Sequence, residues 1–175
     1  MDNTALKYKD ESDRSLGLSG MAIAIYACDG ERFLAGIDVD APSGNGLALT
    51  PEFSFDGNPC LSAKLAWNEM LRQYELATAM LIGNAMCRWY VGRGKRLDST
   101  VERAMRSLVD DEGRRTCELD ADETHRLYEK TFMFLERLFT HAVVADTARR
   151  FASTLSERRS LSSAEILDLL APLGR

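Results

Sequence analysis

The sequence contains only two histidines, His125 and His141, and this scarcity limits the acid–base and metal chemistry available to it. Its four cysteines are Cys28, Cys60, Cys87 and Cys117. No two of them are close enough for a CxxC pair and none adjoins a histidine, so the spacing carries no zinc signature. We interpret all four as reduced thiols, a state typical of a cytoplasmic protein.

The sequence also has no excess of basic residues. The chain has 22 Lys and Arg against 27 Asp and Glu, and its net charge of −5 disfavours general nucleic-acid binding. The longest uncharged stretch in the helical part, residues 76–87, is shorter than the roughly 20 residues that a membrane span needs. The first 14 residues are highly charged and do not resemble a secretory signal. We therefore expect a cytoplasmic protein that does not bind membranes.

Common catalytic motifs are absent as well. Gly94-Lys95 is followed by Arg96, and Trp89 occupies the position of the first glycine in a Walker A loop. Gly17-Leu-Ser-Gly20 lacks the spacing of a nucleophile elbow. We find no internal repeat, and no residue set implies a cofactor.

The composition that remains is that of a globular protein, with 45% hydrophobic and 28% charged residues. Its length of 175 residues suits one domain. Residues 1–19 mix charges with Ser, Gly and Asn without a visible period, which predicts a flexible arm. Residues 20–175 are then expected to form a single α+β domain, with a hairpin region at 20–56 and a helical region at 58–175.

The hairpin is predicted from two apolar runs, 20–28 and 31–40, on either side of Asp29-Gly30. Asp-Gly between such runs is typical of a type I′ turn, which needs positive φ at both central residues. Both faces of this hairpin are apolar, so we expect helices or a second copy of the chain to cover it on both sides. Residues 47–50, and more weakly 52–55, are candidates for a third antiparallel strand.

The rest of the chain is expected to form a bundle of about four helices near 59–91, 99–112, 121–158 and 163–171. Asn58-Pro59 is a typical helix start. Capping boxes are predicted at Ser99/Glu102, Asp120/Glu123 and Ser162/Glu165. Gly92 and Gly113 are candidate stops. The third helix is unusually long, so we expect a bend or a break somewhere after Val144.

One candidate site is a basic and aromatic segment at the end of the first long helix. It consists of Arg88, Trp89, Tyr90, Arg93, Lys95 and Arg96. Cations in a last helical turn complement the free carbonyls and the helix dipole, which explains such residues without a ligand. The alternative is a nucleic-acid patch with the aromatic rings as stacking platforms.

A second candidate is a metal site at Asp122, His125 and Glu129, which share one helical face. The competing interpretation is an acidic first turn of a capped helix, with His125 at the surface. Asp38 and Asp40 alternate on a strand and could meet Asp56 at a sheet end, where clustered carboxylates bind cations. Solubilising groups at a strand end would show the same pattern.

The helix predicted over 121–158 presents more apolar surface than one small sheet needs. One seam runs through Leu127, Phe134, Leu138, His141 and Ala145. A row beside it adds Phe132, Leu135 and Phe139. Surplus apolar surface tends to find a partner. We therefore expect a homodimer whose interface includes Phe132, Leu135, Leu138, Phe139 and His141.

The sequence thus favours a non-catalytic cytoplasmic module for protein interaction or oligomerisation. One alternative is a small metal- or metabolite-binding enzyme with a site between sheet and helices. The other is a nucleic-acid accessory protein that uses residues 88–96.

Overall fold

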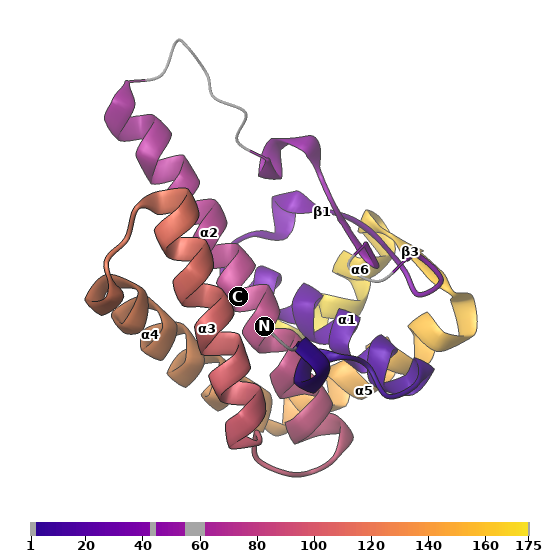
Figure 1. Ribbon diagram of the computed structural model, residues 1–175. Coiled ribbons are helices and arrows are strands. Elements are labelled where there is room, and N and C mark those ends of the chain that lie inside the picture. Colours follow the sequence, from indigo (N-terminus) through magenta and orange to yellow (C-terminus); the bar gives the residue numbers. More distant parts are fainter. Residues whose placement is uncertain (1–2, 43–44, 55–61, 175) are drawn as a thin grey trace.

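The computed structural model describes residues 3–42, 45–54 and 62–174 (Figure 1). Its α-helices are α1 (Glu11–Ala27), α2 (Ala63–Met86), α3 (Ser99–Cys117), α4 (Ala121–Thr140), α5 (Ala142–Arg158) and α6 (Ser163–Leu170). Its strands are β1 (Leu34–Asp38), β2 (Leu47–Leu49) and β3 (Ser160–Ser162). The fold is therefore α+β, a small antiparallel sheet with a helical bundle, as predicted.

The prediction of a first hairpin strand at residues 20–28 is wrong, because residues 20–27 form the second half of α1. Ala22, Ile23, Ala24 and Ile25 are fully buried, since α1 runs through the middle of the bundle between α2 and α5. A helix that is buried on all sides shows no 3.6-residue period. A short apolar run of this kind cannot be assigned to helix or strand from periodicity alone.

The Asp-Gly signal at 29–30 marks the end of α1 and not a hairpin turn. Asp29 has a positive φ of 55°. The Gly30 N–H donates to the Ile25 carbonyl at 2.9 Å, and the Asp29 N–H donates to the Tyr26 carbonyl at 3.2 Å. These two bonds are the Schellman pattern of a helix C-terminus. The type I′ turn required positive φ at both residues, but Gly30 has a φ of −108°, so only Asp29 meets that expectation. A single residue with positive φ is also typical of a helix C-terminus.

The hairpin that does form lies one segment later in the chain. β1 pairs with β2 in antiparallel register, with Ile37 opposite Leu47, so the strand predicted at 47–50 is confirmed. The other neighbour of β1 is β3, with Ile37 opposite Leu161, and the strand order is β2-β1-β3. β3 had no sequence signal, because its three residues connect α5 directly to the capping box of α6.

Residues 11–19 were assigned to a flexible arm, and this was also wrong. They form the first two turns of α1, whose N-terminus is capped by Asp10, with Asp13 N–H donating to its side chain at 2.8 Å. Ser15 and Ser19 are fully buried, and the Ser19 hydroxyl donates to the Ser15 carbonyl at 2.8 Å. Local bonding of this kind lets serine stay inside a helix.

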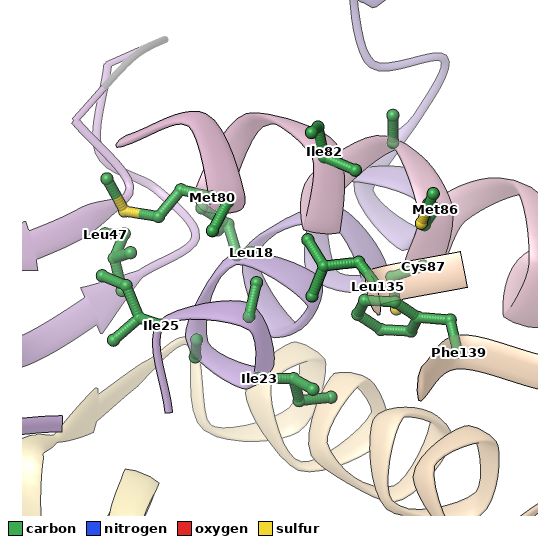
Figure 2. Packing of buried hydrophobic residues seen from close by; sticks show 14 of the residues in the cluster. Leu18, Ile23, Ile25, Leu47, Met80, Ile82, Met86, Cys87, Leu135 and Phe139 are labelled. Carbon is green, nitrogen blue, oxygen red and sulfur yellow. The ribbon is translucent and has the colours of Figure 1, made fainter. Parts of the chain in front are cut away.

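Two glycines allow α1 and α2 to cross at close range. A Cβ added to Gly20 would lie 2.3 Å from the Gly83 carbonyl oxygen, and one added to Gly83 would lie 2.5 Å from the Ala24 Cβ. Around this crossing lies the apolar core, to which α1 contributes Ile23, α2 contributes Ile82 and α4 contributes Phe139 (Figure 2). Small residues allow the two backbones to touch, as in other close helix pairs.

The remaining helices differ from expectation mainly at their ends. The capping boxes at Asp120/Glu123 and Ser162/Glu165 are confirmed. α3 is instead capped by Asp98, whose side chain accepts from Thr100 N–H at 2.8 Å. α3 also continues through Gly113, because that glycine makes room for the Tyr74 hydroxyl.

The long third helix is broken, as predicted, but at His141 and not after Val144. His141 has extended backbone angles (φ −78°, ψ 132°) and separates α4 from α5. Asn58-Pro59 lies outside the described residues, and α2 is seen from Ala63, with the Ser62 side chain accepting from Leu65 N–H at 3.3 Å. Among the described residues, no helix combines the length and apolar character that membrane crossing requires.

Candidate functional site

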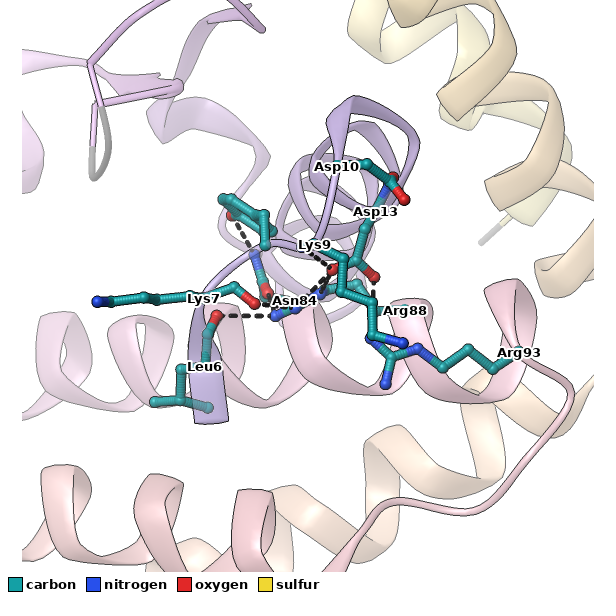
Figure 3. A network of polar contacts seen from close by, with 9 residues as sticks. Leu6, Lys7, Lys9, Asp10, Asp13, Asn84, Arg88 and Arg93 are labelled. Atoms are coloured by element: carbon teal, nitrogen blue, oxygen red, sulfur yellow. Dashed lines mark hydrogen bonds and ion pairs between the residues drawn. The ribbon is translucent and has the colours of Figure 1, made fainter. Parts of the chain in front are cut away.

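The basic and aromatic segment begins in a π-helical turn, Cys87–Gly92, that continues α2. Its first cation, Arg88, is only 2% exposed. The Arg88 guanidinium binds the Asp13 carboxylate through Nε (3.0 Å) and Nη2 (2.6 Å), and it donates to the carbonyls of Leu6 (2.9 Å) and Lys7 (2.7 Å). Figure 3 shows this cluster at the start of α1. The Arg88 side chain is therefore buried and hydrogen-bonded inside the protein, and it cannot reach a phosphate backbone.

The Asp13–Arg88 pair also holds the N-terminal segment against α2. The Tyr8 ring lies under the Arg88 guanidinium at 4.8 Å, and the Tyr8 hydroxyl accepts from the Asn84 side-chain amide at 2.7 Å. Burial by itself would raise the pKa of Asp13. Hydrogen bonds from Arg88 and from the Lys9 N–H, with the charges of Arg88 and Arg93, outweigh burial, so the pKa of Asp13 lies below its usual value.

The next residues of the segment are also engaged by neighbours. Arg93 stacks on the Trp89 ring at 4.2 Å and pairs with Asp13 at 3.3 Å. Tyr90 donates its hydroxyl proton to Glu136 at 2.6 Å. Burial, together with Glu136, raises the pKa of Tyr90 to about 12. Neither aromatic ring is an exposed stacking platform of the kind that single-stranded nucleic acid uses.

Lys95 and Arg96, by contrast, are exposed. They line a hollow of about 430 Å³ between the 92–98 loop and the start of α5, which we call the Lys95 hollow. The structure therefore divides the predicted nucleic-acid residues into a buried group around Asp13 and an exposed pair at this hollow.

The predicted metal residues are only partly brought together. His125 and Glu129 both face Arg106 of α3, whose Nη1 lies 2.9 Å from His125 Nδ1 and whose Nη2 pairs with Glu129 at 2.6 Å. Arg106 also stacks on the Tyr128 ring at 4.5 Å, and Asp122 stays exposed in the first turn of α4. A guanidinium thus occupies the place expected for a metal ion. Within the described residues, no three His, Cys, Asp or Glu side chains gather in a way that could hold a metal.

The acidic end of the sheet has a similar arrangement. The Asp38 side chain accepts from the Asp40 N–H at 2.8 Å, and Asp40 forms a two-point contact with Arg159. Arg159 also pairs with Glu11, so it joins the sheet end to the start of α1. Asp56 lies outside the described residues. Asp40 and Glu11 are thus ion-pair partners of Arg159, whereas the Asp38 carboxylate bonds the local backbone.

The described thiols offer no nucleophile. Cys28, Cys87 and Cys117 are free, and burial raises the pKa of each, most strongly at the fully buried Cys87. A raised pKa keeps the thiol protonated at neutral pH and therefore weakly nucleophilic. Cys60 lies outside the described residues.

The five residues predicted as an interface do not form one surface. Leu135 and Phe139 are buried in the core, whereas Phe132 and Leu138 are half-buried. Phe132 stacks on Tyr128, with ring centroids 5.7 Å apart. His141 is exposed at the break between α4 and α5. Only Leu138 contributes to the apolar surface described next.

That surface centres on Phe134, whose side chain is 44% exposed in the middle of α4. A hollow of about 310 Å³ lies on one side of it, between α4 and the end of α1 at Cys28. A second hollow of about 240 Å³ lies on the other side, where Leu138 faces Tyr26 and Leu173. We call this ridge and its two hollows the Phe134 surface. Phe134 belonged to the seam seen in the sequence, but the sequence could not show which residues of that seam the core would cover.

A third apolar depression lies between α2 and α3. It has two parts, of about 190 and 360 Å³, which share Tyr74, Ala77 and Glu112. Its floor is closed by the Tyr74 hydroxyl, which donates to the Val109 carbonyl at 2.9 Å. Glu112 is the one charged residue among its lining residues.

No family model, curated protein or solved structure matches this chain.

Proposed function

We propose that this chain is a non-catalytic cytoplasmic interaction module that forms a homodimer through the Phe134 surface. The observation that supports the proposal is a half-exposed aromatic ridge with a hollow on each side, all on one face of the molecule. A large exposed apolar side chain in such a setting is typical of an interface anchor.

A ridge beside a hollow is complementary to its own copy. In a two-fold contact, each partner presents the same patch, so Phe134 of one copy can enter a hollow of the other and the reverse. Packing of a helical ridge into a groove of a second helix is the usual geometry between helices. The contact that we propose is therefore α4 against α4 in antiparallel orientation.

Charges at the edge of the surface fit the same arrangement. The hollow on the Cys28 side carries Glu75 and Lys130, and Arg72 lies beside them, paired with Glu75 at 3.6 Å. A patch with both signs of charge can meet its own copy with opposite charges facing, whereas a patch of one sign would repel it. Lys130 of one copy would then lie near Glu75 of the other.

The three described thiols are free, which supports the cytoplasmic part of the proposal, because reduced cysteines are typical of that compartment. The enzyme alternative is weakened at His125 and Glu129, because both side chains contact Arg106. The nucleic-acid alternative is weakened because Arg88 and Arg93 are both paired with Asp13.

The test is sedimentation equilibrium over a wide concentration range, with Phe134→Ala as the variant. Truncation of an interface anchor costs about 2 kcal/mol or more, so the dimer dissociation constant should rise by about 30-fold. Met133→Ala is the matched control, because Met133 is its neighbour on α4, is 51% exposed and lines neither hollow. Its dissociation constant should change by less than about threefold.

Circular dichroism melts of both variants should show intact folds, since neither side chain belongs to the buried core. A wild-type chain that remains monomeric at every accessible concentration would refute the homodimer. Equal weakening by Met133→Ala would refute the role of Phe134.

A further inference from the structure

The proposed dimer does not use the Lys95 hollow. Its walls come from four parts of the chain: the π-helical turn, the loop after it, the end of α4 and the first two turns of α5. Lining side chains that carry the argument are Tyr90, Lys95, Arg96, Thr140, Asp146 and Arg149. A volume of about 430 Å³ lies in the range of small-molecule sites.

The charge inside this hollow is opposite to that of the whole protein. Three cations and one carboxylate line it, although the chain has a net charge of −5. Asp146 is paired with Arg149 at 2.7 Å. Among the described residues, Lys95 and Arg96 have no carboxylate within ion-pair distance, so their charges remain available. A concave cationic region concentrates anions.

The loop that carries the two free cations is held in place by its backbone. Gly94 has a positive φ of 60°, and the Lys95 N–H donates to the Trp89 carbonyl at 3.0 Å. The Arg93 N–H donates to the same carbonyl at 3.3 Å. The chain therefore reverses directly after the π-helical turn, and this reversal presents Lys95 and Arg96 to the hollow.

The start of α5 adds to the positive potential. Its N-cap residue, His141, makes no side-chain cap, and its first turn contains no acidic residue. First-turn N–H groups of a helix carry partial positive charge and lack intrahelical partners. α5 differs in this respect from α4 and α6, whose first turns carry acidic residues and capping boxes.

We propose that the Lys95 hollow binds a phosphate-bearing small molecule, with Lys95 and Arg96 contacting the phosphate. Arginine forms two parallel hydrogen bonds to phosphate oxygens, and lysine supplies a compact charge. Thr140 and Tyr90 also line the hollow and would contact the organic part of the ligand.

Isothermal titration calorimetry at low and moderate salt tests the proposal, with inorganic pyrophosphate and ADP as probes. The wild-type chain should bind at least one probe with one site per chain. The double variant Lys95→Gln/Arg96→Gln should weaken binding by about tenfold or more, because it removes two charge-assisted contacts. Both residues are exposed, so the fold should be retained.

The matched control is Lys64→Gln/Arg126→Gln, which changes the net charge equally but at exposed positions on α2 and α4 outside the hollow. It should change affinity by less than about twofold beyond the general salt effect. Asp146→Asn should tighten binding several-fold, because it removes the one carboxylate of the hollow and releases Arg149.

The proposal would be overturned if neither pyrophosphate nor ADP bound to the wild-type chain. It would also be overturned if the control double variant lost as much affinity as Lys95→Gln/Arg96→Gln. A single-stranded oligonucleotide that binds more than about tenfold tighter than pyrophosphate, with a steep salt dependence, would also overturn it in favour of a nucleic-acid surface.

Discussion

At the scale of single residues, a comparison of two arginine–aspartate pairs shows how burial decides the contribution of an ion pair to stability. Arg88–Asp13 is buried and supported by two backbone carbonyls, whereas Arg159–Asp40 lies in solvent at the sheet end. Removal of one partner from a buried pair leaves an uncompensated charge in the interior. When one partner of an exposed pair is removed, the remaining charge stays hydrated.

We expect Asp13→Asn to lower the free energy of unfolding by about 3 kcal/mol at neutral pH, because Arg88 loses its only carboxylate partner at the cluster. Asp40→Asn is the matched control and should change stability little, since Asp40 is exposed. Urea denaturation at pH 7 measures both. Similar effects of the two substitutions would contradict the assigned role of Asp13.

The same residue predicts a pH dependence. The pKa of Asp13 is lower in the folded protein than its unfolded value of about 3.9, so the ionised carboxylate favours folding. Its contribution is fully present above about pH 5, and it is lost as the pH falls through the folded pKa. Urea midpoints measured from pH 7 down to pH 3 should therefore fall more steeply for the wild type than for Asp13→Asn. Parallel curves would show that the carboxylate does not titrate differently on folding.

At the scale of the secondary-structure elements, glycine has three different roles here. Gly20 and Gly83 let α1 and α2 touch, Gly113 accommodates the Tyr74 hydroxyl, and Gly94 adopts a positive φ after the π-helical turn. From sequence, Gly113 was assigned to a helix stop. Close approach and chain termination both favour glycine, so only the packing distinguishes them.

Gly20→Ala tests the crossing of α1 and α2. In an open helix, this substitution would stabilise by about 1 kcal/mol. Here the new Cβ would lie 2.3 Å from the Gly83 carbonyl oxygen, which is backbone and cannot rotate away. We expect a net loss of about 2 kcal/mol in the free energy of unfolding, measured by thermal or urea denaturation.

Gly92→Ala serves as its control. The nearest atom to a Cβ at Gly92 is the end of the flexible Leu16 side chain, at 2.7 Å, which can move. Stability should change by less than about 1 kcal/mol. A stabilising effect of Gly20→Ala would show that the two helices do not approach as closely as described.

At the scale of the whole molecule, the two proposed surfaces lie on different parts of α4 and serve different ligands. Phe134 and Leu138 line a hollow together with the C-terminal end of α1 and the C-terminal residues Leu173 and Gly174. Phe139 and Thr140, by contrast, border the Lys95 hollow. Neither set of lining residues includes a member of the other. The two activities should therefore be separable.

We expect Phe134→Ala to leave pyrophosphate affinity within about twofold of wild type, and Lys95→Gln/Arg96→Gln to leave the dimer dissociation constant equally unchanged. Calorimetry and sedimentation on the same preparations measure both quantities. A coupled loss in either variant would mean that one surface depends on the other, and the hollow would then have to be redefined as part of the dimer interface.

The amino-acid sequence alone determined the α+β class, the strand at 47–50, two capping boxes and the presence, but not the position, of a break in the long helix. These features depend on contacts within a few residues, which composition and spacing record directly. The tertiary structure decided the rest. α1 is a helix because α2 and α5 bury it on every side, a case in which helix and strand share one apolar pattern. Arg88 faces inward because Asp13, 75 residues away in sequence, meets it in the core. Phe134 remains at the surface because the core of this fold is filled by Leu135 and Phe139, and only packing in three dimensions distributes neighbouring apolar residues between interior and surface.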